Sequence, residues 1–243
     1  MSKTARSGQV SATLTYDGSF GDYSALQLTI TRGDQTFDRE VAPQGCEVPY
    51  CGPGFGHEPT IRVIDVNGDD EPEVVLNLYG GGAHCCFLAD ILRFAGDRYT
   101  DRTLNFADPG YRLLQLDGRG TPEFLSADHR FAYRFASFAS SGMPVRILRF
   151  QQGRLTDVTK RFPRRVAADA QLQFGYWKKW QRTRDAYEAR GPLAAWAADQ
   201  YRLGQRRNVL RQLRATADAG RLKGGRKWVA SLDKFLVHLG YNR

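Results

Sequence analysis

Apolar and polar residues alternate along the first part of the chain, and this alternation predicts short β-strands. It is clear at residues 11–16 and 24–31, and a glycine-containing turn follows each of these segments. Residues 43–59 are rich in Pro and Gly and predict an irregular loop. Within residues 61–79, two apolar runs bracket a short acidic loop. We therefore expect antiparallel β-structure over this part of the chain.

A helical period replaces the alternation from Arg164 onward. Apolar and aromatic residues recur at i, i+4, i+8, i+11 and i+15 and would share one helix face: Leu172, Tyr176, Trp180, Thr183 and Tyr187. Gly191-Pro192 interrupts this pattern, and Gly240 ends a last amphipathic segment. We therefore predict three or four helices in this part of the chain. The chain is therefore predicted to be α+β, with antiparallel β blades over residues 1–162, as stacked sheets or a partial propeller, and a helical domain over residues 163–243.

Charge divides the chain near the same place. The 243 residues carry a net charge of +9. Residues 1–159 hold 15 basic and 20 acidic residues, whereas residues 160–243 hold 20 basic and 6 acidic ones. The basic part is expected to attract an anionic glycan, a cell-wall polymer or a protein, or to face its acidic neighbour. No apolar run of about 18 residues occurs and the first residues lack the apolar segment of a signal peptide, so no transmembrane span is predicted.

The acidic loop carries the strongest candidate chemistry. Oxygen-bearing side chains fall at relative positions 1, 3, 5 and 9, and the backbone carbonyl at position 7 would add a donor: Asp65, Asn67, Asp69 and Glu73, with Glu71. Gly68 permits the tight turn. Because hard cations prefer such oxygen sets, we expect one structural Ca²⁺ here; the alternative is a solvated turn without an ion. Position 12 is Leu76, which does not fit an EF-hand.

An internal repeat surrounds this loop. Residues 65–74 align with residues 115–124 at a spacing of 50, sharing Gly-x-x-x-Pro-Glu. Further along, Ile-Leu-Arg-Phe at residues 91–94 returns at residues 147–150, at a spacing of 56. The repeated unit is therefore predicted to be a four-stranded antiparallel blade with an acidic loop near its start.

These motifs resemble the FG-GAP or VCBS repeat family, the blades of integrin-type β-propellers. Phe55-Gly56, the acidic loop and the Gly80-Gly81-Gly82 turn occur in that family's order, and the resemblance covers about residues 50–160. It implies β-propeller-like blades with Ca²⁺ in the loop. Asp70 stands where the family usually has Gly, and Glu73 where it has Asp. Two clear blades, with a third from the N-terminal strands, are too few to close a propeller, which needs at least about four.

The second acidic loop aligns with the first without a gap, but it lacks two of the candidate calcium ligands. Gln115 and Arg119 occupy relative positions 1 and 5. Our hypothesis is that the Arg119 guanidinium stands where an ion would sit and bridges Asp117 and Glu123.

Four cysteines flank the first loop: Cys46, Cys51, Cys85 and Cys86. Two disulfides are expected, and the favoured pairing joins the 46/51 segment to the 85/86 segment, although four cysteines allow three connectivities. A zinc site is the rival, but adjacent cysteines in a strand point apart. Paired cysteines with a calcium loop fit an oxidising, extracellular or cell-envelope location.

Other candidates are weaker. Gly80–Cys86 could form a nucleophile or phosphate site around His84, although disulfides and a tight turn explain the same residues. Aromatic and basic residues interleave near the start of the helical part and continue as an arginine-rich surface, which suggests anion binding or a plain amphipathic helix. The candidate residues are Trp177, Lys178, Lys179, Arg182, Arg206 and Arg207.

Together these features predict a secreted or cell-surface, calcium-stabilised binding protein whose basic helical domain meets an anionic or protein partner. The alternative is an extracellular hydrolase or transferase with a site between blades and helices, using His129, Asp128 or the His84 region. No complete catalytic set is recognisable. Nucleic-acid binding would depend on charge alone, and the cysteines argue against it.

Overall fold

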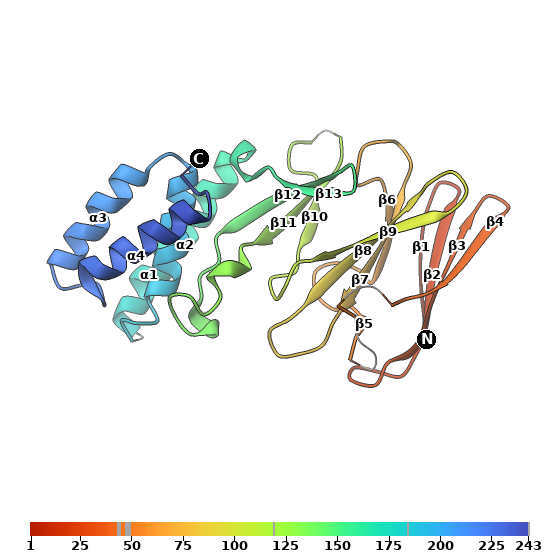
Figure 1. Ribbon diagram of the computed structural model, residues 1–243, viewed down its shortest axis with the longest axis horizontal. Helices are drawn as coiled ribbons and strands as arrows, with labels where there is room; N and C mark the ends of the chain where they lie inside the picture. Colours follow the sequence, from red (N-terminus) through yellow and green to blue (C-terminus); the bar gives the residue numbers. More distant parts are fainter. Residues whose placement is uncertain (43–44, 47–49, 119, 184, 243) are drawn as a thin grey trace. The chain divides into compact units, whose positions relative to one another are not determined.

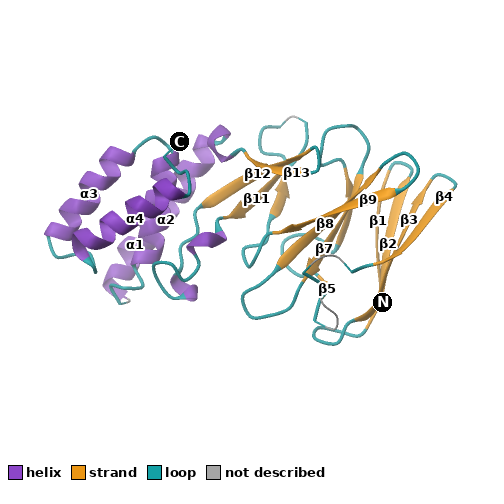
Figure 2. Ribbon diagram, viewed as in Figure 1, coloured by secondary structure: helices purple, strands orange, loops and turns teal. Residues whose placement is uncertain are grey.

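The computed structural model describes residues 1–42, 45–46, 50–118, 120–183 and 185–242. As predicted, these residues form an α+β structure of antiparallel sheets with α-helices near the C-terminus (Figures 1 and 2). The described strands make three sheets and close neither a barrel nor a propeller. None of the described helices is long and apolar enough to cross a membrane.

The first sheet is a meander whose spatial order β1-β2-β3-β4 follows the chain. Its strands are β1 (Ser2–Ser7), β2 (Val10–Asp17), β3 (Ser24–Arg32) and β4 (Gln35–Glu40). Neighbouring strands pair antiparallel throughout. Alternate residues of β2, including Val10, Ala12 and Leu14, are buried, so the period of two seen in the sequence reflects one covered face.

The second sheet has the order β5-β7-β8-β9, with β6 also paired to β7. Its strands are β5 (Gly52–Pro53), β6 (Ile61–Ile64), β7 (Glu73–Tyr79), β8 (Phe87–Phe94) and β9 (Tyr99–Asn105). Every residue of β7 is buried. Val74, Leu76 and Leu78 pack in a cluster with the first sheet, and Val75 packs in another cluster with Phe124 of the third sheet. Because both faces of β7 are covered, this strand shows a continuous apolar run.

The third sheet has the order β10-β11-β12-β13. Its strands are β10 (Arg112–Leu114), β11 (Glu123–Ala127), β12 (Val145–Gln151) and β13 (Arg154–Asp157). The order of strand, acidic loop and three further strands therefore occurs twice in the chain, from β6 and again from β10. This is the repeated four-stranded unit that the sequence predicts.

The chain divides into two compact units. Unit 1 comprises Met1–Ser126 and Leu148–Thr156, and unit 2 comprises Ala127–Ile147 and Asp157–Arg243. The boundary differs from the predicted division into residues 1–162 and 163–243. The reason is packing: the segment before β12 contributes Phe131 and Phe135 to the apolar core of the helices, so it belongs with them although it precedes them in sequence.

Unit 2 is built mainly from helices. In the described part of this unit, the α-helices are α1 (Pro163–Thr183), α2 (Arg190–Arg202), α3 (Arg206–Asp218) and α4 (Gly225–His238), and the short 3₁₀ helices are η1 (His129–Phe131), η2 (Phe138–Ser140) and η3 (Thr159–Arg161). Most of α2 is buried, and Leu193, Trp196 and Tyr201 lie in one core with Leu232 and Leu236 of α4.

Helix α1 buries a different face from the one predicted. Leu172 and Tyr176 are 51% and 41% exposed, Tyr187 beyond the helix is also exposed, and the side chain of Thr183 lies outside the described part. The face turned to the core is formed by a second set with the same spacing: Val166, Ala170, Phe174 and Trp177. Both stripes satisfy a helical period, and only the packing of α1 against its neighbours selects between them.

Replacing Leu232 by Ala tests the core of unit 2. Leu232 is fully buried, so Leu232→Ala should lower the free energy of unfolding by about 2–5 kcal/mol. All four tryptophans lie in helices of unit 2, so urea unfolding followed by tryptophan fluorescence reports this unit. Leu172→Ala removes the same side chain from an exposed site of α1 and should cost well under about 1 kcal/mol. Equal effects of the two variants would contradict the assignment of the buried face.

Candidate functional site

The first acidic loop, between β6 and β7, is folded by its own carboxylates. Asp65 accepts backbone N–H hydrogen bonds from Gly68 at 2.6 Å and Asp70 at 3.1 Å, and Asp69 accepts one from Glu71 at 3.1 Å. Asp70 has φ +64°, a left-handed conformation that glycine adopts more easily. Its own backbone N–H bond to Asp65 accompanies this conformation. The short side chains thus curl the backbone and turn their oxygens toward the loop.

Glu73, the first residue of β7, is fully buried. It accepts a hydrogen bond from the backbone N–H of Val66 at 2.9 Å and another from the side-chain amide of Asn67. Burial raises the pKa of Glu73 to about 7, and the nearby carboxylates of Asp69 and Asp65 add to the rise against the lowering effect of the Val66 bond. Among the described residues, no Lys or Arg forms an ion pair with any of these three carboxylates. In the part of the chain that is described, these three carboxylates therefore lie close together with no cation paired to any of them.

The oxygen atoms of this loop are chemically suited to a hard cation. Three carboxylates and one amide oxygen are ligands that Ca²⁺ accepts. Asp65 Oδ1 already accepts N–H bonds from Asn67 and Gly68, so its Oδ2, which accepts one from Asp70, is the oxygen that keeps a lone pair for an ion. The Glu71 carboxylate is paired with Arg32, so Glu71 would contribute through its backbone carbonyl. Within the described ranges, no three or more His, Cys, Asp or Glu side chains are already arranged as a metal cage. Binding an ion would therefore require these side chains to turn inward.

In the second loop, between β10 and β11, the buried glutamate is paired with an arginine of a neighbouring strand. Glu123 is fully buried, and its carboxylate is bound by the guanidinium of Arg149 on β12, which also reaches Asp117 at 3.0 Å. The backbone N–H of Leu116 donates to Glu123 at 3.1 Å, as Val66 does to Glu73 in the first loop. Arg119, predicted to bridge Asp117 and Glu123, lies outside the described residues. Arg149 makes such a bridge from β12.

The repeat contains the signal that identifies Arg149. At a spacing of 56, Arg149 corresponds to Arg93 of β8. In the second sheet Val74 pairs with Leu92, so Arg93 stands beside Glu73 in register, yet its side chain is exposed. The two loops therefore share a buried glutamate at the start of a strand, and they differ in whether an arginine covers it.

Arg149→Gln tests the role of this arginine. Loss of the guanidinium leaves a buried carboxylate unpaired, and the expected cost is about 3–5 kcal/mol of unfolding free energy for unit 1. Unit 1 holds no tryptophan, so its unfolding is the part of the far-UV circular dichroism change in urea that tryptophan fluorescence does not follow. Adding Glu123→Gln should restore part of the loss, because the unpaired charge is then gone. If the double variant were no more stable than the single one, the ion pair between Arg149 and Glu123 would not contribute to stability.

The cysteines pair locally. Cys46 bonds to Cys51 and Cys85 bonds to Cys86, with Cα–Cα separations of 4.9 Å and 3.0 Å, and no cysteine is free. The favoured cross-pairing of the two segments is therefore wrong. Each cysteine is paired with the one nearest to it in sequence. For Cys46 and Cys51, at a sequence separation of 5, closing the short loop costs little chain entropy. With all four thiols bonded, neither a thiolate nucleophile nor a cysteine-ligated zinc site forms.

An aromatic cavity of about 220 Å³ lies in unit 1 beside Phe55 and Phe87. His57 contributes to its lining, but the buried polar groups there bind one another. The Tyr111 hydroxyl donates to Asn77, and Glu58 accepts from the backbone of Leu113 at 2.8 Å. These groups fasten the sheets together, which explains their burial without a ligand.

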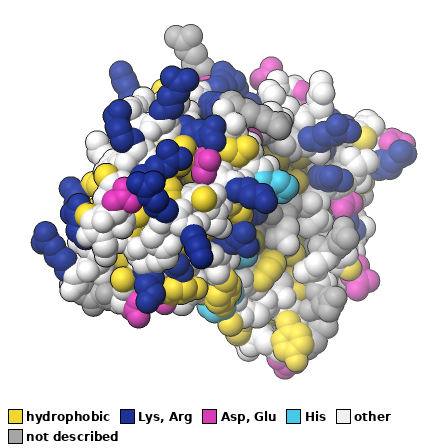
Figure 3. Space-filling view, turned by 60° about the vertical axis from the view of Figure 1, so that its left-hand side comes forward, with side chains coloured by type: hydrophobic (Ala, Val, Ile, Leu, Met, Phe, Trp, Pro, Cys, Tyr) yellow, Lys and Arg dark blue, Asp and Glu magenta, His cyan; other side chains and the backbone are white. Residues whose placement is uncertain are grey.

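The predicted anion-binding residues have different environments. Trp177 packs on Phe174, and the Lys178 ammonium lies 4.8 Å from the same ring. Arg206 is committed to Asp233 through two contacts of 2.9 Å. The remaining members are exposed: Lys179, Arg182 and Arg207. Figure 3 shows Lys and Arg side chains spread over the face that carries the helices.

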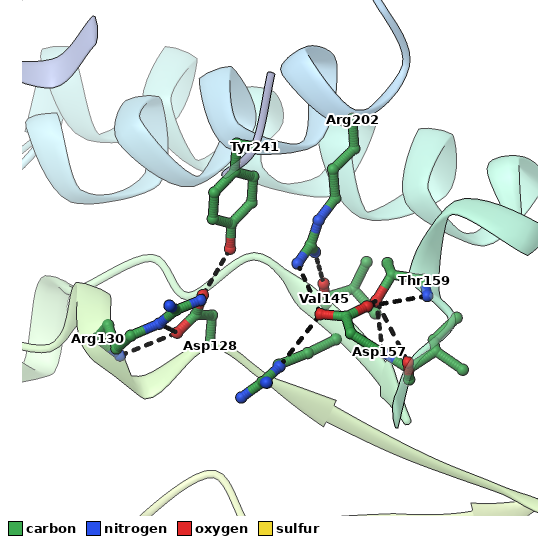
Figure 4. A network of polar contacts seen from close by, with 9 residues as sticks. Asp128, Arg130, Val145, Asp157, Thr159, Arg202 and Tyr241 are labelled. Carbon is green, nitrogen blue, oxygen red and sulfur yellow. Dashed lines mark hydrogen bonds and ion pairs between the residues drawn. The ribbon is translucent and has the colours of Figure 1, made fainter. Parts of the chain in front are cut away.

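A second group of charged residues converges inside unit 2 around Asp128, which the sequence suggested only as a weak catalytic candidate. Asp128 is buried and accepts from Arg130 at 2.7 Å and from the Tyr241 hydroxyl at 2.7 Å (Figure 4). Burial acts to raise the pKa of Asp128, but these hydrogen bonds hold it below its ordinary value. Both Asp128 oxygens are thus occupied. His129 keeps a buried Nδ1 with no partner in the described chain, and it is not joined to this carboxylate.

Asp199, on α2, is a fully buried carboxyl. Neither of its oxygens has a hydrogen-bond donor among the described residues. Burial raises the pKa of Asp199 to about 10, and the neighbouring Asp169 raises it further. Asp199 is therefore protonated at neutral pH and can donate to Asp169, whose carboxylate also accepts from the backbone of Val145 at 3.0 Å.

Asp199→Asn should stabilise unit 2 at and above neutral pH. The folded protein keeps a proton that the unfolded chain releases above the ordinary pKa of 3.8, so the contribution of Asp199 to stability is complete below that pH and falls as pH rises toward about 10. Asn does not titrate and avoids this loss, so the variant should have a free energy of unfolding at least about 1 kcal/mol higher than that of the wild type at neutral pH. Tryptophan-monitored unfolding across pH measures it. The exposed Asp185→Asn is the control, and a wild-type stability that does not fall between neutral and alkaline pH would contradict the assignment.

Comparison with known proteins gives partial similarities. No protein-family model matches the chain. Over 141 residues it is 31% identical to the uncharacterized protein y4bJ of Sinorhizobium fredii, covering 56% of this chain and 21% of that protein. Over 103 residues it is 31% identical to the probable thylakoid lumen protein sll0997 of Synechocystis sp., covering 41% of this chain and 30% of that protein. The matched regions thus span under a third of either relative.

Among solved structures, the chain shows a resemblance to a Xanthomonas Type IV secretion system related protein. The identity is 14%, and the match covers 65% of this chain and 92% of that one. The TM-score is 0.21, which is too low to support an argument about fold.

Proposed function

We propose that this chain is an exported, non-enzymatic binding module whose β unit is stabilised by one Ca²⁺ and whose basic helical unit binds an anionic polymer. The observation that carries the calcium part is the contrast between the two acidic loops. In the second, Arg149 neutralises the buried Glu123; in the first, Glu73 and its two neighbouring carboxylates have no ion-pair partner among the described residues. A divalent cation supplies the missing charge.

The proposed ligands follow from this arrangement. Asp65, Asn67, Asp69 and Glu73 would hold the ion with their side chains, and Glu71 with its carbonyl. The resemblance of residues 50–160 to FG-GAP and VCBS blades supports the same assignment. Bound Ca²⁺ would restrict the loop and raise the stability of the folded state in proportion to ion concentration.

Location outside the reducing cytosol is supported by two observations. Both disulfides lie in unit 1, and such bonds persist in oxidising compartments. One relative is named a probable thylakoid lumen protein. Both are compatible with a periplasmic, lumenal or extracellular protein.

The anionic partner is supported by charge and by the unburied stripe of α1. Unit 2 contains 23 Lys and Arg and 8 Asp and Glu. Leu172 and Tyr176 remain exposed on the same helix as Lys179 and Arg182. Exposed rings beside cations bind anionic glycan or cell-wall polymer through apolar contact and charge together. No complete set of catalytic groups accompanies this surface in the described residues.

Thermal unfolding with CaCl₂ or EDTA tests the calcium assignment. Calcium should raise the melting temperature of unit 1 by about 4 °C, corresponding to about 1 kcal/mol. This transition is the far-UV circular dichroism change that tryptophan fluorescence does not follow. The tryptophan-monitored transition of unit 2 should not move. Asp65→Asn should abolish the shift, whereas Asp117→Asn in the second loop should preserve it. A melting temperature that is the same in calcium and in EDTA would rule out the calcium site.

A further inference from the structure

A cavity in unit 2 has cations on its wall that the proposed function does not use. Its volume is about 300 Å³. It is lined by Arg130, Asp157, Lys160, Arg202, Leu239, Gly240 and Tyr241. Four separate segments supply these residues: η1, the end of β13 with η3, the end of α2, and the residues after α4. Pockets of this size and mixed lining accept small ligands.

Arg202 is held rigidly in this wall. Its guanidinium lies 4.3 Å from the centre of the Tyr241 ring and donates to the backbone carbonyl of Val145. It also contacts Asp157 at 3.4 Å, and only 7% of the side chain is exposed. Figure 4 shows Arg202 and Tyr241 both extending toward the strand side of the network. A guanidinium fixed in this way loses little conformational entropy when an anion binds.

Arg130 and Lys160 complete the positive wall. Nε and Nη2 of Arg130 bind Asp128, while its side chain is 45% exposed, so the other edge of the guanidinium can meet a ligand. Lys160, on η3, is exposed and has no ion-pair partner within the part of the chain described. It is the cation with the greatest freedom to close over a bound group.

The charges around the cavity do not balance. The lining residues and their direct ion-pair partners comprise four cations, Arg130, Arg146, Lys160 and Arg202, and two carboxylates, Asp128 and Asp157. Asp157 is fully engaged, since it accepts from Thr159 and pairs with Arg146 and Arg202. Burial raises the pKa of Tyr241 well above its ordinary value, so the phenol stays neutral. An excess of two positive charges remains in a small concave space.

We propose that this cavity binds a phosphate monoester group. Such a group carries about −1.5 to −2 charge at neutral pH and three acceptor oxygens, which matches the charge excess and the mixture of guanidinium and ammonium donors. The C-terminal end of α4 also lines the cavity through Leu239 and Gly240. Its partial negative charge opposes an anion, so the guanidinium and ammonium groups must outweigh it. The site is independent of the calcium loop, which lies in unit 1.

Isothermal titration of the whole chain with inorganic phosphate tests the proposal. Wild type should bind with saturable heat, and Lys160→Gln, at an exposed position where folding is not at risk, should weaken the affinity about tenfold. Lys234→Gln removes the same charge from an exposed position of α4 outside the cavity lining and should leave the affinity unchanged. Absence of saturable heat in wild type, or an equal loss in the two variants, would overturn the proposal.

Vesicle sedimentation separates two sources of the same chemistry. Retention on phosphatidic acid vesicles that is lost in Lys160→Gln and absent on phosphatidylcholine would assign the group to a lipid head. Phosphate binding in solution without vesicle retention would assign it to a soluble phosphorylated molecule. Retention that survives Lys160→Gln but depends on net charge, with no phosphate binding, would refute the cavity as the site.

Discussion

Burial of a carboxylate at the start of a central strand is the constraint on which unit 1 depends. Strand β7 is covered on both faces, and Glu73 begins it; β11 begins in the same way with Glu123. A buried ionised carboxylate costs several kcal/mol unless hydrogen bonds and an opposite charge compensate it. In each loop a backbone N–H seven residues earlier donates to the glutamate. The two repeats then differ in the source of positive charge.

Arg149 provides that charge in the second repeat because it lies on the neighbouring strand, within reach of Glu123 and Asp117. In the first repeat, Arg93 at the corresponding place is exposed, and the loop has gained Asp65 and Asp69. The two differences are complementary: where the corresponding arginine is exposed, the loop carries two additional carboxylates. An ion in one loop and an arginine in the other would give both strands the same electrostatic support.

The buried carboxyl groups of unit 2 are stabilised in two different ways. Asp128 is stabilised as an anion by Arg130 and Tyr241, whereas Asp199 is stabilised as a neutral acid beside Asp169. The remaining cations accumulate at the surface and around one cavity. The two buried carboxyls of unit 2 are thus accommodated in opposite protonation states, one by hydrogen-bond donors and the other by keeping its proton.

Local pattern alone determined much of this protein. Alternation marked β2, the helical period marked the C-terminal helices, and the repeat at spacings of 50 and 56 marked two four-stranded units with acidic loops, because each of these depends on residues close in sequence. Tertiary structure decided which helix stripe is buried, since two stripes of α1 have equal spacing. It also decided that residues 127–147 join the helices. The contact of Arg149 with Glu123 and the cavity around Arg202 join segments far apart in the chain. These contacts form only when the strands and helices pack together, and a pattern read along the sequence does not show which distant residues will meet.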